Sequence, residues 1–187
     1  MRGLDWSALS LREKIGQTML IKVTPELTRS SEDELAAFLA AFPVGGIFLC
    51  REGLGESVGD RESLADFIEK CQHAAGIPLF VAADMENGCH TLANDVPPLP
   101  SLMALGAAGD PELAYAYGRS IAIGARSLGI NLALSPVVDL NLNPLNPITN
   151  IRSIGDDPDA AIRLLTTLLC GMQDEGLAVT AKHFPGH

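Results

Sequence analysis

The chain has 187 residues, 47% of them hydrophobic and 19% charged, which fits one globular domain with a buried core. Its 13 basic and 23 acidic side chains give a formal charge of 13 − 23 = −10, and such a surface repels the backbone of a nucleic acid. No apolar run approaches the roughly 20 residues of a membrane-spanning helix, and residues 1–7 hold no apolar signal-peptide core. We therefore expect neither nucleic acid nor membrane as a partner.

The four cysteines, Cys50, Cys71, Cys89 and Cys170, are far apart and form no C-x-x-C pair. This spacing argues against a zinc site or a disulfide framework. It predicts free thiols in a reducing compartment, so we expect the cytoplasm.

Two capping boxes predict the first helices. Ser10 is followed three residues later by Glu13, and Ser31 is followed in the same way by Glu34. Apolar residues at helical spacing follow Ser31, and Pro43 ends that helix. Between the two helices, residues 18–23 are predicted to form a buried strand, and residues 45–50 form the next strand.

The alternation continues toward the end of the chain. Residues 53–59 contain three glycines that do not match G-x-G-x-x-G, and we interpret them as a flexible loop. A helical stripe of four apolar residues comes next and ends near Gly76. Helices then begin at Asp110-Pro111 and at Asp157-Pro158, because Asp is a favoured N-cap and Pro a favoured first residue. These two helices are expected to end at Gly129 and Gly176. The remaining strands are predicted at residues 78–84, within 130–140 and at 177–181.

The predicted strands are continuous apolar runs, which is typical of a parallel sheet covered by helices. Polar residues follow all five strands at their C-terminal ends, among them Asp84 with Glu86, Asp139, and Lys182 with His183. An open doubly wound sheet binds ligands mainly at one switch point, whereas a barrel carries its active site around the whole C-terminal rim. The pattern favours an α/β fold that is a partial TIM (β/α)8 barrel, with about five of eight βα units.

Three motifs at these strand ends could carry chemistry. Asp84 and Glu86 could grip sugar hydroxyls, or they could form a solvated acidic loop. Arg152 could fork to a ligand, or it could pair at the surface with Asp156 or Asp157. Lys182 and His183 supply a cation and a titratable ring at the same rim.

His183 and His187 have the spacing of a metal-binding pair on a helix. Pro185 lies between them, and proline cannot occupy a helix interior, so we expect no metal and no other cofactor.

Taken together, these segments resemble family 3 glycoside hydrolases over essentially the whole chain. Residues 9–17 are similar to the opening helix of that family, and Asp84-Met85-Glu86-Asn87-Gly88 is similar to its Asp-Gln-Glu-Gly-Gly loop. Residues 99–107, 135–139, 146–147 and 152–158 also match. The most specific motif is Lys182-His183-Phe184-Pro185-Gly186-His187, which resembles the β-N-acetylhexosaminidase branch.

The resemblance implies a role for four residues, namely binding of a nonreducing N-acetylglucosamine by Asp84, Arg152, Lys182 and His183. It also implies a carbohydrate substrate and a retaining mechanism. A further arginine of many relatives corresponds here to Leu92. The family's nucleophile and acid/base would lie beyond His187, so no catalytic residue is assigned within the chain.

We therefore expect residues 1–187 to be the N-terminal part of a barrel domain. By itself the chain would be inactive and poorly stable. The leading hypothesis is removal of terminal β-N-acetylglucosamine from peptidoglycan- or chitin-derived fragments. A β-glucosidase or β-xylosidase of the same family, and a noncatalytic module that binds a sugar or phosphate, remain as alternatives.

Overall fold

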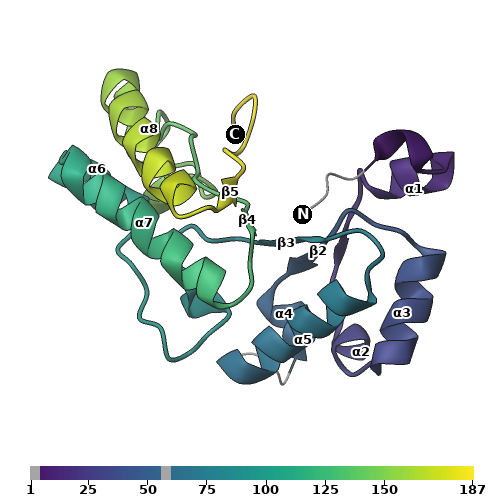
Figure 1. Cartoon of the computed structure of the whole chain (residues 1–187). Coiled ribbons are helices and arrows are strands. Elements are labelled where there is room, and N and C mark those ends of the chain that lie inside the picture. Colours follow the sequence, from purple (N-terminus) through teal and green to yellow (C-terminus); the bar gives the residue numbers. More distant parts are fainter. Residues whose placement is uncertain (1–4, 56–59) are drawn as a thin grey trace. The chain divides into compact units, whose positions relative to one another are not determined.

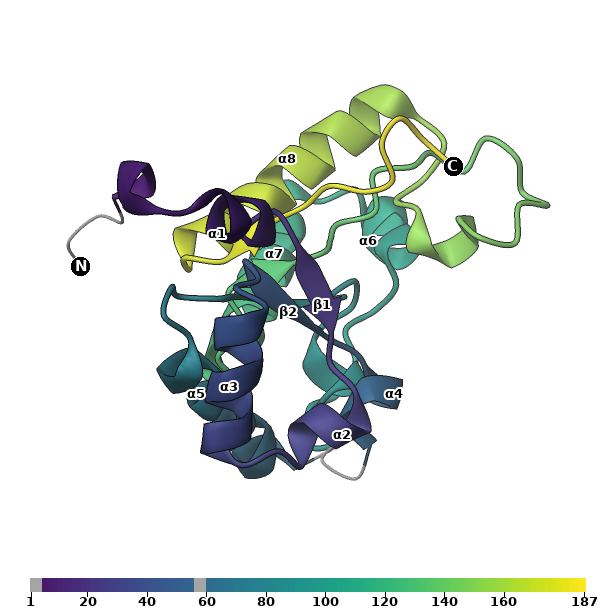
Figure 2. The same cartoon turned by 90° about the vertical axis from the view of Figure 1, so that its right-hand side faces the viewer.

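The computed structural model describes residues 5–55 and 60–187, which divide into two compact units, Met1–Ala82 and Ala83–His187. Figures 1 and 2 show the elements of each unit from two directions. None of the helices formed by the described residues combines the length and apolar content needed to cross a lipid bilayer.

The first unit alternates helices and strands along the chain. Its strand β1 pairs in parallel with β2, with Ile21 opposite Ile47, and β3 follows β2 in the order of the sheet. Helices α3 and α5 contact each other and lie on one side of β1 and β2 (Figures 1 and 2). The elements are η1 (Trp6–Ala8), α1 (Leu11–Gly16), β1 (Leu20–Lys22), α2 (Pro25–Thr28), α3 (Glu32–Ala41), β2 (Gly46–Leu49), α4 (Arg51–Leu54), α5 (Arg61–Ala74) and β3 (Phe80–Ala83).

Both predicted capping boxes are confirmed. Ser10 begins α1 and Ser31 begins α3, and in each case the serine side chain accepts from the N3 backbone while the N3 glutamate accepts from the cap backbone. These hydrogen bonds satisfy N–H groups that have no partner within the helix.

Two predictions for the first unit are corrected. β1 is not a buried strand, because Leu20 is 42% exposed. The glycine-rich segment after β2 is not simply a loop, because residues 51–54 form α4, whose Gly53 lies against the carbonyl of Val23. Gly59 lies outside the described residues. Helix α2 was not predicted at all.

The second unit holds the two long helices of the chain. Its strands β4 and β5 pair in parallel, and an isolated parallel bridge joins Val137 to Lys182 further along. Both predicted Asp-Pro helix starts are confirmed at α7 and α8, and the αL turns after them fall at Gly129 and Gly176. The elements are η3 (Cys89–Thr91), α6 (Leu102–Ala108), α7 (Pro111–Ser127), β4 (Leu132–Ala133), η4 (Asn150–Arg152), α8 (Pro158–Asp174) and β5 (Ala178–Val179).

Helices α7 and α8 lie side by side and make the most extensive helix contact of this unit (Figure 1). Two glycines allow their backbones to approach. A Cβ at Gly118 would lie 2.0 Å from the carbonyl oxygen of Leu168, and one at Gly171 would lie 2.3 Å from that of Tyr115. The two helices are therefore in direct backbone contact at these glycines.

Candidate sugar-binding site

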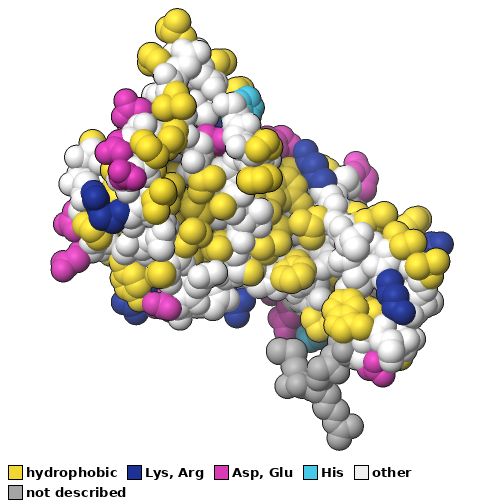
Figure 3. Space-filling model, turned by 90° about the horizontal axis from the view of Figure 1, so that it is seen from above, with side chains coloured by type: hydrophobic (Ala, Val, Ile, Leu, Met, Phe, Trp, Pro, Cys, Tyr) yellow, Lys and Arg dark blue, Asp and Glu magenta, His cyan; other side chains and the backbone are white. Residues whose placement is uncertain are grey.

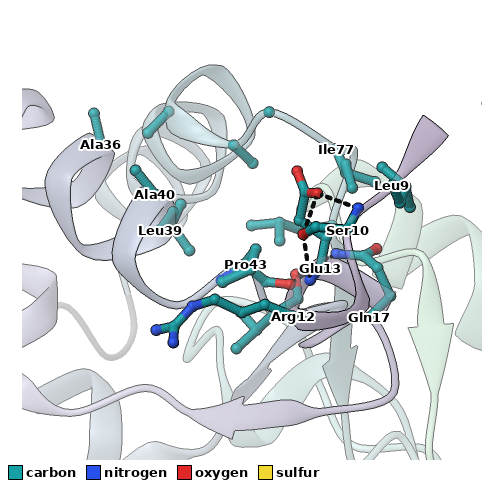
Figure 4. A pocket seen from close by; sticks show the side chains of 15 residues that line it. Leu9, Ser10, Arg12, Glu13, Gln17, Ala36, Leu39, Ala40, Pro43 and Ile77 are labelled. Atoms are coloured by element: carbon teal, nitrogen blue, oxygen red, sulfur yellow. Dashed lines mark hydrogen bonds between the residues drawn. The ribbon is translucent and has the colours of Figure 1, made fainter. Parts of the chain in front are cut away.

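A cavity of about 820 Å³ lies in the first unit, between α1, α3 and the segment after α5 (Figure 4). Its polar side chains are already committed to the fold. Glu13 completes the capping box with Ser10, Arg12 donates to the carbonyl of Ala41, and Gln17 donates to the carbonyls of Pro43 and Val44. These bonds give the polar side chains of the cavity structural roles in the first unit.

The charged side chains that the sequence singled out lie in the second unit. Two carboxylates, Asp84 and Glu86, lie in the segment that follows β3. Met85 is completely buried, whereas the side chain of Asp84 on one side of it is 53% exposed and that of Glu86 on the other is 20% exposed. The buried methionine therefore fixes a short segment that presents two carboxylates.

Lys182, three residues after β5, binds both of these carboxylates. Its Nζ lies 2.6 Å from Oδ1 of Asp84 and 2.7 Å from Oε1 of Glu86, and its side chain is only 15% exposed. The ammonium group is therefore largely shielded from water, whereas Asp84, one of its two partners, remains half exposed.

Arg152, the last residue of η4, reaches the same carboxylate. Its Nε and Nη2 donate to the two oxygens of Glu86 over 2.8 and 2.7 Å, and Nη1 donates to the carbonyl of Ile148 over 3.0 Å. Two parallel bonds of this kind fix the plane of the guanidinium group. Arg152 thus pairs with Glu86 and not, as the alternative interpretation held, with Asp156 or Asp157.

A third carboxylate, Asp139, binds residues 183 and 187. Its Oδ2 lies 2.6 Å from Nδ1 of His183 and accepts from the backbone N–H of the same residue over 3.1 Å. Its Oδ1 accepts from the backbone N–H of His187 over 2.8 Å. The side chain of Asp139 is 2% exposed, so these bonds are shielded from water. Because the carboxylate can only accept, Nδ1 of His183 carries the hydrogen.

The hydroxyl of Ser153 connects the segments that carry Arg152 and Asp139. Ser153 is completely buried. Its Oγ lies 2.7 Å from the carbonyl oxygen of Asp139 and 2.9 Å from the carbonyl oxygen of Gly155, both within hydrogen-bonding distance. Ser153 therefore connects the backbone next to Arg152 with the backbone of Asp139, the residue that binds His183.

The environment shifts the pKa values of these groups in consistent directions. Burial raises the pKa of Glu86, but hydrogen bonds from Arg152 and Lys182 outweigh it and leave that pKa below its usual value. Burial also raises the pKa of Asp139. Hydrogen bonds from His183 and His187 outweigh it, so the pKa of Asp139 is lowered. The hydrogen bonds to Glu86 raise the pKa of Arg152. Both carboxylates are thus held in the ionised form.

The cluster retains capacity to bind a polar ligand. Arg152 has five N–H donors, of which three are used, and Lys182 has three, of which two are used. Within the described residues, no hydrogen bond engages Oδ2 of Asp84 or Nε2 of His183. Donors and acceptors at close spacing suit the hydroxyl groups of a sugar.

No group of three or more His, Cys, Asp or Glu side chains among residues 5–55 and 60–187 is arranged to hold a metal ion. The segment between His183 and His187 is non-helical, and the two rings meet edge to face at 5.7 Å. All four cysteines are free thiols.

The structure brings Asp84, Arg152 and Lys182 into one ion-pair cluster, joined through Glu86. His183 follows Lys182 in the chain but is held by Asp139. The connecting roles of Glu86 and Asp139 were missed, although both residues stand at predicted strand ends. Leu92, the position at which the resemblance implied an arginine in relatives, is 2% exposed and belongs to the core.

Comparison with known proteins identifies relatives over nearly the whole chain. The family model for the glycosyl hydrolase family 3 N terminal domain matches residues 10–187. The beta-N-acetylglucosaminidase/beta-glucosidase of Cellulomonas fimi is 32% identical over 190 residues, which cover 98% of this chain and 32% of that protein.

Two solved structures are also similar. A family 3 beta-N-acetylglucosaminidase from Paenibacillus sp. FPU-7 aligns with a TM-score of 0.85 and 38% identity, over 96% of this chain and 34% of that one. NagZ from Neisseria gonorrhoeae, in complex with N-trifluoroacetyl-D-glucosamine, aligns with a TM-score of 0.78 and 26% identity, over 90% of this chain and 51% of that one. These matches confirm the predicted α/β fold of the TIM-barrel class. The chain spans about a third of the length of the first two relatives.

Proposed function

Because the chain belongs to the glycosyl hydrolase family 3 N-terminal domain family, we propose that it supplies the sugar-binding rim of an exo-acting β-N-acetylhexosaminidase. One observation carries this proposal. Arg152 and Lys182 share the carboxylate of Glu86, and beside them Asp84 keeps a carboxylate oxygen with no hydrogen bond within the described residues. Such a cluster can both donate to and accept from the hydroxyl groups of a terminal sugar ring.

In this proposal, Asp84, Arg152, Lys182 and His183 contact the nonreducing N-acetylglucosamine. Asp84 accepts a hydroxyl hydrogen through Oδ2. Arg152 and Lys182 donate through their remaining N–H groups. His183 offers Nε2, an acceptor in the neutral ring because Nδ1 holds the hydrogen toward Asp139. The name of the Paenibacillus relative, and the N-trifluoroacetyl-D-glucosamine bound to the Neisseria relative, support N-acetylglucosamine as the sugar.

Hydrolysis with retention needs a nucleophile and an acid/base that flank the bond. The carboxylates of the cluster are engaged otherwise, since Glu86 and Asp139 use both oxygens and Asp84 pairs with Lys182. We therefore assign no catalytic residue here. Residues 1–187 would form the N-terminal part of a barrel domain, and the rest of that domain would supply the catalytic groups.

The substrate class would be fragments of peptidoglycan or chitin that end in β-N-acetylglucosamine. The wide spacing of the four free cysteines supports a reducing compartment, which we take to be the cytoplasm. A β-glucosidase activity is the second candidate, because the name of the Cellulomonas fimi relative includes it.

The test uses the complete natural polypeptide that contains these residues. It compares the rates at which this polypeptide hydrolyses two aryl glycosides, an N-acetylglucosaminide and a glucoside. We expect kcat/KM for the N-acetylglucosaminide to exceed that for the glucoside at least tenfold. Calorimetric titration should likewise show that N-acetylglucosamine binds more tightly than glucose. A preference for glucose in both measurements would replace the proposed function with that of a β-glucosidase.

A further inference from the structure

The carboxylate of Glu86 is occupied on both oxygens by the two cations of the site. Oε2 accepts from Nε of Arg152, and Oε1 accepts from Nη2 of Arg152 and lies 2.7 Å from Nζ of Lys182. The side chain is 20% exposed, whereas Asp84, which shares Lys182 with it, is 53% exposed. Glu86 is thus less exposed than Asp84, and each of its oxygens already binds a cation of the site.

The backbone of Glu86 is itself held in place. The hydroxyl of Tyr117 on α7 lies 3.1 Å from the carbonyl oxygen of Glu86 and 2.7 Å from that of Pro100. The preceding Met85 is completely buried. Because α7 is locked against α8 at Gly118, these contacts connect the carboxylate to the rigid part of the second unit.

The two cations depend on Glu86 to stay together. Without this carboxylate, Arg152 and Lys182 would repel each other with only Asp84 to offset them. Arg152 would keep a single anchor, the carbonyl of Ile148. A guanidinium group held by one bond can rotate, whereas one held by a bidentate pair cannot.

We propose that Glu86 is a positioning residue, which sets the plane of the Arg152 guanidinium and the place of the Lys182 ammonium so that their free N–H groups meet the hydroxyls of the sugar. The inference rests on the proposed function. It concerns a residue that touches the binding groups and not the substrate.

The test uses three variants of the complete natural polypeptide. Glu86→Gln keeps the shape and removes the charge. Glu86→Asp keeps the charge but shortens the reach by one methylene. Glu175→Gln is the matched control, because Glu175 pairs with Arg119 at 2.5 Å elsewhere in the second unit. The readouts are crystal structures, calorimetric titration with N-acetylglucosamine, and thermal unfolding.

We expect Glu86→Gln to displace the Arg152 guanidinium and to weaken binding of N-acetylglucosamine roughly 10- to 100-fold, the scale on which misplaced binding groups act. Glu86→Asp should also bind more weakly than the wild type, since charge without the bidentate geometry does not suffice. Glu175→Gln should bind as the wild type does. A merely structural role would lower the melting temperature and leave the dissociation constant of the folded variant unchanged.

The inference is overturned if Arg152 and Lys182 keep their positions in the variant structures, or if Glu86→Asp binds as tightly as the wild type. Should Glu86→Gln fail to fold, Glu86→Asp decides on the same two readouts. A wild-type protein that binds no N-acetylglucosamine contradicts the proposed function instead, and the positions of Arg152 and Lys182 in the variants still decide the role of Glu86.

Discussion

At the scale of single residues, Lys182 is the group on which the binding cluster converges. We predict that Lys182→Ala lowers kcat/KM on an aryl N-acetylglucosaminide roughly 100-fold, because the change removes a donor and leaves Asp84 and Glu86 without their shared cation. Steady-state kinetics of the complete polypeptide measure it. Lys70→Ala, at an exposed position of α5, is the control. Unchanged kinetics in Lys182→Ala would remove this residue from the site.

Asp139 leads to a prediction about stability and pH. The lowered pKa of Asp139 means that its ionised form stabilises the fold above the unfolded pKa of about 3.9, and that this stabilisation is lost as the pH falls through the lower native pKa. Asp139→Asn should therefore cost about 1–3 kcal/mol near pH 7, since buried donors lose an acceptor, and progressively less as the pH falls below about 3.9.

Denaturant unfolding at several pH values measures this difference. Asp66→Asn, at an exposed position, should show no such dependence. A cost of Asp139→Asn that does not fall at all as the pH is lowered below about 3.9 would mean that the charge of Asp139 contributes nothing.

The sequence predicted the individual site residues better than their connections. Asp84, Lys182 and His183 could be found because polar residues directly follow apolar strands. The pairing of Arg152 with Glu86, 66 positions away, and of His183 with Asp139, 44 positions away, could not be found, because a spacing along the chain says nothing about such distant partners.

At the scale of elements, the glycine contact of α7 and α8 should be intolerant of any side chain. We predict that Gly118→Ala lowers the free energy of unfolding by about 3 kcal/mol, since the new methyl group would meet a backbone oxygen that cannot rotate away. Thermal or denaturant unfolding measures the change.

Gly76→Ala is the matched control, because a Cβ there would contact nothing within 4 Å. The Gly76→Ala change restricts the unfolded chain, so it should leave the free energy of unfolding unchanged or raise it slightly. Equal stability of the two variants would show that α7 and α8 can separate at little cost.

Element boundaries could be predicted where a local signal exists. Capping boxes and Asp-Pro starts act within one helical turn, so the beginnings of α1, α3, α7 and α8 were predicted correctly. The four-residue helices α2 and α4 were missed, since they are too short for an apolar period. β4 and β5 have only two residues each, although the apolar runs that predicted them are longer, because strand length depends on pairing with neighbours.

At the scale of the whole molecule, apolar surface is exposed in both units. Hydrophobic side chains are visible at several places on the face shown in Figure 3. In the first unit, Met19 is 50% and Phe80 52% exposed, and in the second unit Ile162 is 66% exposed. The poor stability expected for residues 1–187 alone stays a prediction, and these exposed side chains give it a physical basis.

We further predict that residues 1–187 alone do not hydrolyse a fluorogenic N-acetylglucosaminide. The carboxylates near the proposed sugar-binding rim are paired or buried, so none is free to act as nucleophile. The measurement is turnover by the purified chain against an empty-vector preparation. Turnover clearly above that background would place catalytic groups within the chain, with Asp84, Glu86 and Asp139 as the first to test.

The hydrogen bond between Asp139 and His183 has a consequence for chemical labelling. Since Nδ1 is occupied, acylating reagents such as diethyl pyrocarbonate can attack this imidazole only at Nε2. The ring is 35% exposed, enough for a small reagent to reach it. A sugar hydroxyl bound at Nε2 would block the reaction, so the degree of modification, read by mass spectrometry, would report occupancy of the site without any turnover.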